Sequence, residues 1–454
     1  MSMTMGDNAV GRYDRFLTKR SRAREPSAIR ALMNLMSKPG AISLGGGMPN
    51  PDTFPLTELS FSMRGEDGQN VSIKIDNVPE MLQYTPSAGL PALRAFLEDF
   101  QDHFHAPPQS IRENREIFMS TGSQDALTKT IECLVETTDS ILVEEAVYAG
   151  TLNFLKPYGC NVVGVKTDSQ GLVPSAMDTL LTNWAQDHPL EAKPKVLYVI
   201  PTGSNPTGIS LSLERRRELY AIACKHDLLI LEDDPYYFLQ FRDEADWIPS
   251  LYSMDVDERV VRFDSFSKVI SAGFRLGFMT GPKEIVNRVV LHQQVTDLHA
   301  SGVSQSILLG ILQQWGIRGF TEHVRKVAGF YRERRDDLVE SISSHLPSNM
   351  VRLAVPDAGM FIWLNFEGLR STREFVRRLV HDSGILVVAG HEFSPSGKDL
   401  PFARLSFSLA SQSDMDNAML RLGEALRKYD QEHNGGMLTC DEGPTHRLEQ
   451  PFPQ

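Results

Sequence analysis

One lysine of this sequence lies between hydroxyl groups and is followed by an arginine. The stretch SFSKVISAGFR (265–275) comes after an apolar run and contains Ser265, Ser267, Lys268 and Arg275. A lysine amine can bond covalently to an electrophilic carbon, while hydroxyl and guanidinium groups bind phosphate. This spacing suits a covalent anchor beside an anion-binding site.

Polar groups also follow the other strand-like runs in the middle of the chain. The segment TGSQ (121–124) places small residues and unpaired N–H groups at the start of a helix-like segment, an arrangement that binds anions. Tyr148, Asn205, Asp233 and Tyr236 each come after an apolar run. In open α/β sheets the ligand crevice lies beyond the carboxyl ends of the strands, so we expect these groups to meet there.

Together these groups suit an aromatic cation that carries a phosphate. Candidates for the phosphate are Ser123, Gln124, Ser265, Ser267 and Arg275. Asp233 suits a protonated ring nitrogen, and Tyr148 suits stacking on the ring. Asn205 and Tyr236 suit hydrogen bonds to a ring oxygen. Pyridoxal phosphate makes these demands, with Lys268 as its Schiff-base lysine.

Each feature alone has a simpler interpretation. A single lysine is usually solvated, and an acidic pair after a strand is often a helix cap. The order of the features decides between the two interpretations. A glycine turn, an aromatic residue, an asparagine, Asp-x-x-Tyr, SxSK and an arginine each end a separate strand-like run. Chance would have to produce all of these features independently and in this order, so the pattern favours a cofactor site.

The elements that would position these groups alternate between strand-like and helix-like patterns. Strands are predicted near 116–120, 140–148, 160–166, 195–201, 228–237 and 259–268, with 275–281 as a further, antiparallel one. This alternation predicts an α/β fold with a mostly parallel central sheet flanked by helices. A long amphipathic helix (320–346) and strands near 359–366, 384–390 and 402–408 predict a smaller α+β domain.

Four regions are therefore expected. Residues 1–55 form an N-terminal arm, rich in Gly and Pro at 42–55, and a helix that joins the small domain. Residues 56–320 form the large cofactor-binding domain, and residues 321–429 form the small domain. The polar stretch 430–454 is expected to be a disordered tail.

Composition narrows the class of protein. The 454 residues carry a net charge of −12, which argues against nucleic acid or an anionic membrane as partner. No apolar stretch approaches the ~20 residues of a membrane span. Four cysteines are scattered singly, which predicts reduced thiols, a cytoplasmic location and no metal site. Basic residues between 12 and 24 are faintly similar to a mitochondrial presequence, so the matrix is the alternative.

With these motifs in view, the sequence resembles the class I aminotransferases of the fold-type I pyridoxal phosphate enzymes. It looks most like the kynurenine/α-aminoadipate aminotransferases, with the fungal aromatic aminotransferases as near relatives. The resemblance extends from residue 24 to about residue 429. The motifs that carry it are SLGGGMPNPDTFP, LQYTPSAGLPALR, IPTGSNPTG, EDDPYYFLQF, DSFSKVISAGFRLG, AGMFIWL and RLSFS.

The resemblance implies the same cofactor roles as above and adds substrate groups. Arg404 matches the arginine that binds the substrate α-carboxylate, with Asn205 beside it. Gly47 matches the point where the arm approaches the substrate, and Arg30 matches an arginine that meets its distal end. Tyr84 matches a tyrosine that reaches the cofactor phosphate and substrate of the neighbouring subunit, which implies a homodimer with shared sites. One departure is EEAVY (144–148), which lacks a proline that close relatives carry before Tyr148.

The implied reaction is ping-pong transamination between an amino acid donor and a 2-oxoacid acceptor, 2-oxoglutarate. The donor is α-aminoadipate, kynurenine or an aromatic amino acid. A pyridoxal phosphate lyase or decarboxylase of the same fold is an alternative, because the cofactor site alone does not dictate the reaction. A non-catalytic, cofactor-binding regulator is a further one, but the N-terminal arm is too short for a DNA-binding domain.

Overall fold

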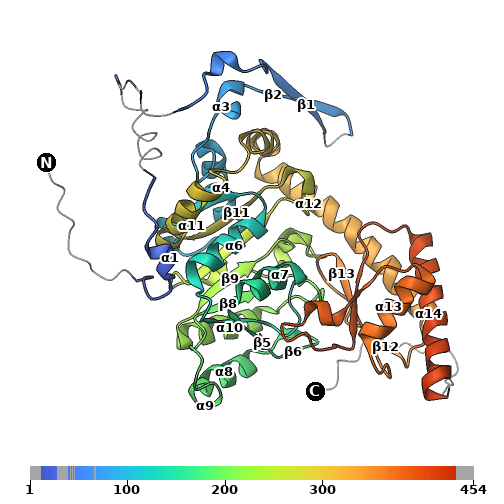
Figure 1. Cartoon of the computed structure of the whole chain (residues 1–454). Helices are drawn as coiled ribbons and strands as arrows, with labels where there is room; N and C mark the ends of the chain where they lie inside the picture. Colours follow the sequence, from blue (N-terminus) through green and yellow to red (C-terminus); the bar gives the residue numbers. More distant parts are fainter. Residues whose placement is uncertain are drawn as a thin grey trace.

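A seven-stranded sheet forms the centre of the computed structural model, which describes residues 12–27, 39–40, 42, 44, 47–65 and 68–435 (Figure 1). In spatial order its strands are β3 (Arg115–Ser120), β11 (Gly277–Pro282), β10 (Val260–Ser265), β9 (Leu229–Asp233), β8 (Val196–Val199), β4 (Ser140–Glu144) and β5 (Asn161–Val165). β11 is antiparallel to both of its neighbours, and the other neighbouring strands of this sheet pair in parallel. The predicted mostly parallel sheet is confirmed, as is the antiparallel strand.

The reversed direction of β11 follows from its short connection to β10. Parallel neighbours need a crossover of a dozen or more residues, usually a helix. Only the loop 266–276 joins the two strands, and it holds a single 3-10 turn (Ala272–Phe274). Arg275 ends this turn in the left-handed conformation, with a φ of 51°. The chain therefore folds back beside β10, and Lys268 lies in the connecting loop.

Alternate residues of the central strands enter two different hydrophobic cores. Ile141 and Val143 of β4 belong to one core, whereas Leu142 belongs to the other. The first core receives α4 (Pro91–His105), α6 (Ser123–Leu134), α7 (Ala149–Tyr158), α11 (Lys283–Thr296) and part of α12 (Gly302–His345). The second receives α5 (Gln109–Glu113), α8 (Pro174–Thr182) and α10 (Leu213–His226). Burial on both faces explains why the strands are almost continuously apolar.

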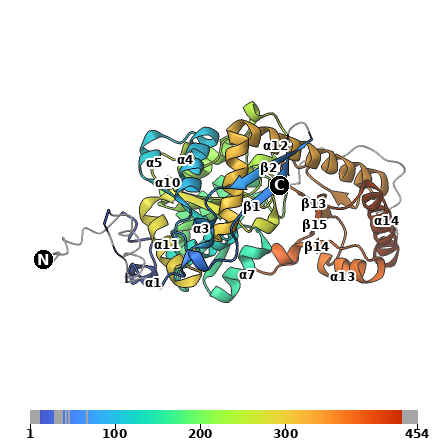
Figure 2. The same cartoon turned by 90° about the horizontal axis from the view of Figure 1, so that it is seen from above.

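The small domain has its own sheet and core. Its strands lie in the order β12 (Val351–Arg352), β13 (Phe361–Phe366), β15 (Phe402–Ser406) and β14 (Val388–Ala389), and all pairs are antiparallel. Helices α13 (Thr372–Ser383) and α14 (Gln412–Asn434) cover it at one end of the molecule (Figure 2).

Four further short elements lie outside the small domain, namely α1 (Lys19–Arg22), β6 (Thr167–Asp168), β7 (Gly171–Leu172) and α9 (Trp184–Asp187).

Two boundaries differ from the sequence expectation. The long helix begins at Gly302 rather than at 320, with a kink at Gly316, so it belongs to both domains. α14 continues to Asn434, and Asp430 is fully buried, so the first residues of the expected tail are helical. Leu422 and Leu426 hold this helix against the small-domain sheet. Residues 436–454 lie outside the described residues, and the domain division near residue 320 remains a prediction.

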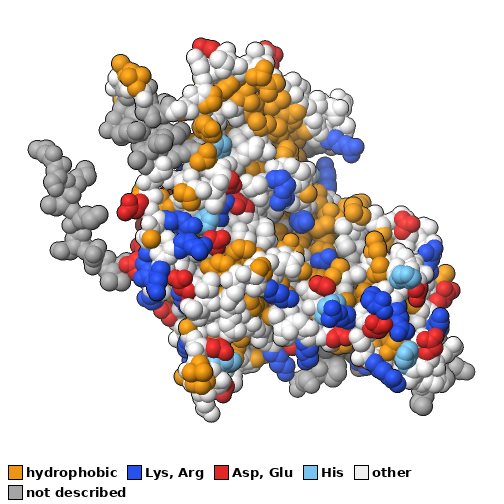
Figure 3. Space-filling view, viewed as in Figure 1, with side chains coloured by type: hydrophobic (Ala, Val, Ile, Leu, Met, Phe, Trp, Pro, Cys, Tyr) orange, Lys and Arg blue, Asp and Glu red, His pale blue; other side chains and the backbone are white. Residues whose placement is uncertain are grey.

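A β-hairpin that the sequence analysis missed projects from the large domain (Figure 1). It consists of β1 (Leu59–Arg64) and β2 (Asn70–Ile75), followed by α3 (Val78–Leu82). Exposure alternates along β1, which is the pattern of a half-buried strand. Hydrophobic side chains gather over this part of the surface (Figure 3).

The N-terminal segment 12–27 packs on the large domain, whereas residues 28–38 lie outside the described residues, so the expected junction of the arm with the small domain stays a prediction. Tyr13, Phe16 and Leu17 are buried in the first core. The Tyr13 hydroxyl donates to the backbone carbonyl of Glu258 at 2.7 Å. Residues 12–27 are thus part of the folded body. No helix in the described part of the chain is long and apolar enough to cross a membrane.

We predict that Tyr13→Ala lowers the free energy of unfolding by about 3 kcal/mol, because it removes a large core side chain. Arg12→Ala should cost less than about 1 kcal/mol, since the ion pair of Arg12 with Asp257 is solvent-exposed. Chemical denaturation of both variants and the wild type measures the difference. Equal losses would mean that the segment is held by its charges and not by burial.

Candidate active site

The carboxyl edge of the central sheet brings together groups from five segments. Asp233 ends β9, and Lys268 follows β10. Tyr148 precedes α7 after the end of β4, and Asn205 lies in the loop after β8. Arg404 enters from β15 of the small domain. Hydrogen bonds and electrostatic effects between these groups place them in one cluster.

Asp233 is buried, and only one of its two carboxylate oxygens has a partner. Its Oδ2 accepts a hydrogen bond from the Tyr198 hydroxyl of β8 at 2.8 Å. Thr151 donates to the same hydroxyl at 3.1 Å. The other oxygen, Oδ1, is buried without a hydrogen-bond donor among the described residues. Burial raises the pKa of Asp233 to about 7, so a cation beside the carboxylate would favour its ionised form.

Lys268 is half-buried and lies close to two guanidinium groups. Burial lowers the pKa of its amine, and the charges of Arg275 and Arg404 lower it further. A lowered pKa increases the share of neutral amine, which is the nucleophilic and proton-accepting form. Lys268 is therefore suited to covalent and proton-transfer chemistry.

An anion cradle lies between the start of α6 and Arg275. Ser123 and Gln124 form the first turn of α6, where backbone N–H groups lack helical partners. Arg275 Nη1 donates to the Ser267 hydroxyl at 3.3 Å, and the Ser265 hydroxyl accepts from the Ser267 N–H at 3.2 Å.

Two glycines are required for this close approach. A Cβ added at Gly122, which has a φ of 82°, would lie 2.6 Å from Arg275 Nη2. A Cβ added at Gly277 would lie 2.5 Å from the backbone nitrogen of Ser123. The cradle therefore combines N–H groups, hydroxyls and one guanidinium, which is the donor set for a phosphate.

Arg404 is the point where the small domain meets the other groups. Its Nη1 donates to Asn205 Oδ1 at 2.8 Å. The Asn205 side chain also forms a hydrogen bond with the Tyr236 hydroxyl. Burial raises the pKa of this phenol. Burial also raises the pKa of Tyr148, which lies near enough to Asp233 and Arg404 to feel their charges. No carboxylate of the described residues forms a salt bridge with Arg404.

Three candidates do not join this cluster within the chain. Tyr84 is 44% exposed, and its ring packs edge-on, with centroids 6.0 Å apart, against His299 of the loop that joins α11 to α12. Gly47 is exposed, and a Cβ added there would meet no atom within 4 Å. Arg30 lies outside the described residues.

Sequence reasoning missed Tyr198 and a buried ionic cluster beside Asp233. Arg262 of β10 lies 3.2 Å from Glu232, 3.0 Å from Asp234 and 2.8 Å from Asp264. Its guanidinium is fully buried. The signal was present as charged residues inside the apolar runs LLILEDD and RVVRFD.

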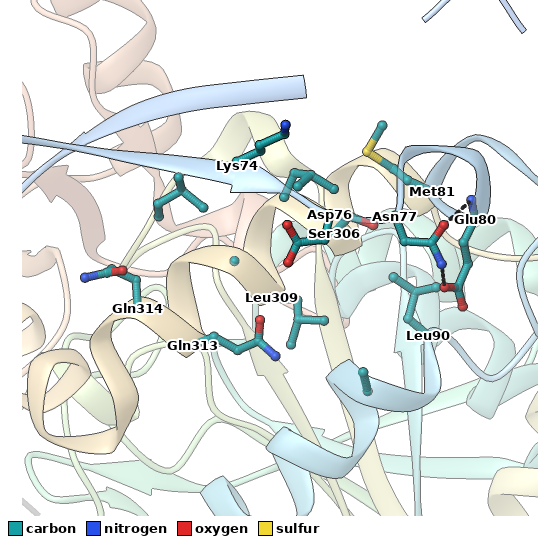
Figure 4. A pocket seen from close by; sticks show the side chains of 14 residues that line it. Lys74, Asp76, Asn77, Glu80, Met81, Leu90, Ser306, Leu309, Gln313 and Gln314 are labelled. Atoms are coloured by element: carbon teal, nitrogen blue, oxygen red, sulfur yellow. Dashed lines mark hydrogen bonds between the residues drawn. The ribbon is translucent and has the colours of Figure 1, made fainter. Parts of the chain in front are cut away.

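A separate groove of about 410 Å³ lies between β2, α3 and α12 (Figure 4). Lys74, Asp76, Asn77 and Glu80 contribute polar groups, and Leu309 contributes apolar surface. None of the candidate residues lines this groove. The chemistry is therefore assigned by the polar cluster at the strand ends and not by the size of a cavity.

Comparison with known proteins gives matches over nearly the whole chain. Residues 70–422 match the family model described as Aminotransferase class I and II. The mitochondrial kynurenine/alpha-aminoadipate aminotransferase of Mus musculus is 40% identical over 426 residues, covering 92% of this chain and 99% of the relative. An aromatic amino acid aminotransferase of Dictyostelium discoideum is 32% identical over 425 residues, covering 92% and 88%.

Solved structures agree with the sequence matches. Aminotransferase Aro8 from Candida albicans superposes with a TM-score of 0.83 at 30% identity, covering 91% of this chain and 97% of that one. Pyrococcus horikoshii kynurenine aminotransferase, solved with PMP and KYN, superposes with a TM-score of 0.72 at 25% identity, covering 92% and 98%. The predicted fold class and family resemblance are confirmed: this chain belongs to the class I and II aminotransferases.

Proposed function

We propose that this aminotransferase transfers the amino group of α-aminoadipate, kynurenine or an aromatic amino acid to 2-oxoglutarate. Pyridoxal phosphate is the cofactor of class I aminotransferases. The choice of donors is supported by the names of the mouse and Dictyostelium relatives. The observation that carries the proposal is the buried, unpartnered Oδ1 of Asp233 within one cluster with Lys268 and Arg404.

The described side chains fit the cofactor. Asp233 Oδ1 suits a protonated pyridine nitrogen, since the cation would answer a buried negative charge. Asn205 and Tyr236 are the candidates for the ring oxygen, Tyr148 for the ring face and Lys268 for the covalent bond. The phosphate candidates are Ser123, Gln124, Ser265, Ser267 and Arg275.

When bound, pyridoxal phosphate supplies an electron sink for the pair left by removal of the substrate α-proton. Arg404 binds the substrate α-carboxylate, because its fork suits bidentate contact and no carboxylate of the described chain neutralises it. Lys268 would accept the substrate α-proton on its neutral Nζ and would return it from the resulting ammonium. Asp233 stays ionised and keeps the ring nitrogen protonated. The donor's 2-oxoacid leaves before the acceptor binds, which makes the kinetics ping-pong.

We propose a homodimer in which Tyr84 completes the site of the partner. Its exposed ring and its contact with His299 support this, because they place Tyr84 outside its own chain's cluster at the strand ends. Gly47 and Arg30 are proposed to lie near the bound substrate.

We propose that the protein works in a reducing compartment, the cytoplasm or the mitochondrial matrix. Cys133, Cys160 and Cys224 carry no disulfide, and the mouse relative is named as mitochondrial. Burial of Tyr13 limits any processing to the first few residues, since later cleavage would remove core side chains.

The half-reaction tests the proposed function. Adding α-aminoadipate or kynurenine to the cofactor-loaded protein, without an oxoacid, should remove its visible absorbance band, and 2-oxoglutarate should restore it. Lys268→Ala should slow this change by at least about 100-fold, because the proton-transfer group is lost. Lys283→Ala is the matched control, since the Lys283 amine donates to the Glu113 carbonyl at 2.9 Å and lies outside the cluster at the strand ends. A band that responds to another amino acid alone would correct the donor and keep the reaction.

Tyr198→Phe should weaken cofactor binding about tenfold at pH 6.5, with a smaller effect at pH 8.5. Below its raised pKa the Asp233 carboxyl is protonated in the empty site and gains little from Tyr198. The carboxyl is ionised when it pairs with the bound cofactor, so at pH 6.5 Tyr198→Phe weakens mainly the cofactor-bound state. At pH 8.5 the carboxyl is ionised in both states, so the substitution destabilises the empty and the bound protein alike and the affinity changes less.

Fluorescence titration with pyridoxal phosphate at both pH values gives the ratio of variant to wild-type dissociation constants. Tyr220→Phe is the control, because Tyr220 makes the same bond to a different buried carboxylate, Asp255, at 2.8 Å. A ratio that does not change with pH would contradict this account of Asp233.

Mixed dimers test whether Tyr84 acts across the interface. We expect Tyr84→Ala and Lys268→Ala homodimers to be impaired, and a hybrid of the two to regain about half of the wild-type activity per dimer. One hybrid site would then contain both Lys268 and the partner's tyrosine. If Tyr84 acts within its own chain, both hybrid sites are defective and no activity returns.

A further inference from the structure

We propose that Phe393 is a positioning residue for Arg404, and that its ring sets how tightly the substrate carboxylate is bound. This inference rests on the proposed function, in which Arg404 holds that carboxylate. Phe393 lies in a short turn of the small domain, Gly390–Phe393, and is fully buried.

Two aromatic rings flank the Arg404 guanidinium. Its central carbon lies 5.1 Å from the ring centroid of Phe393 and 4.4 Å from that of Phe361. Both distances are within the range of attraction between a cation and an aromatic ring, and this attraction is stronger where water is excluded. With no carboxylate of the described chain beside it, Arg404 is oriented by these rings and by Asn205.

The ring of Phe393 is itself held firmly. It meets Trp363 edge-on, with centroids 5.4 Å apart and planes at 86°. Phe393 and Trp363 form a junction cluster with Ala146 and Leu400, and all four are buried. Ala146 belongs to the large domain and the other three residues belong to the small domain, so this cluster packs the two domains together.

Phe393 also contacts the loop that carries Tyr148. The backbone N–H of Val147 donates to the Phe393 carbonyl at 2.9 Å. Tyr148 follows directly, and it is the candidate for stacking on the cofactor ring. Phe393 thus connects Arg404 to the loop of Tyr148. A substrate carboxylate bound by Arg404 is therefore held in a fixed position relative to the cofactor ring.

The test is Phe393→Met in the cofactor-loaded enzyme, because methionine removes the ring and keeps most of the volume. We expect the dissociation constant of 2-oxoglutarate, measured by calorimetry, to rise about tenfold. KM for donor and acceptor should rise by a similar factor, with little change in kcat or in cofactor affinity. In an Arg404→Lys background the same substitution should have no further effect, since the two residues act together.

Phe402→Met is the matched control. The Phe402 ring stacks on the Trp363 ring with centroids 5.1 Å apart, so Phe402→Met disturbs the packing of the same tryptophan that Phe393 contacts. Unchanged 2-oxoglutarate binding in Phe393→Met, an equal loss in Phe402→Met, or a full effect in the Arg404→Lys background would each overturn the inference. If the wild-type holoenzyme itself binds no 2-oxoglutarate, the proposed acceptor fails, and the inference fails with it.

Discussion

A carboxylate buried at the end of a strand is stable as an anion only if a positive group answers its charge. Asp233 is in that position, with one oxygen bonded to Tyr198 and the other without a donor in the described chain. Leaving a buried charge uncompensated costs about 3–5 kcal/mol. The arrangement is understandable if the site is built around a cation that arrives with the cofactor, and the surrounding elements keep that position open.

The strands that carry this carboxylate are cross-linked on their other side by Arg262. Glu232 and Asp234 flank Asp233 and, because side chains alternate along a strand, point to the opposite face of β9. Arg262 bonds or pairs with both of them and with Asp264, and all of these groups are buried. The ends of β9 and β10 are thereby held in register, which fixes Asp233 relative to the loop of Lys268.

Substrate binding depends on a second contact, the one between the domains. Arg404 belongs to the small-domain sheet, yet it bonds Asn205 of the large domain. Asp357 stabilises the same junction, because it accepts a hydrogen bond from the Ser210 hydroxyl at 2.7 Å and forms an ion pair with Arg242. The aminotransferase site is therefore shared between two hydrophobic cores, and its geometry changes if the domains move.

The sequence alone determined the order of the chemical groups, the α/β class and the cofactor. This was enough because parallel strands end at one edge of a sheet, so a pattern read along the chain specifies which groups meet. It placed the tail too early and missed the hairpin of β1 and β2. Those features depend on packing partners that local periodicity does not contain.

Only the tertiary structure decided how the groups are oriented. In the sequence Tyr198 cannot be distinguished from an ordinary core residue. In the fold, strand pairing brings its hydroxyl to Asp233, 35 positions away. Arg404 and Asn205 are 199 positions apart, and Phe393 reaches Arg404 only through the fold of the small domain. Such contacts arise from register and domain packing, which are set by the burial of many side chains at once and leave no motif in the sequence.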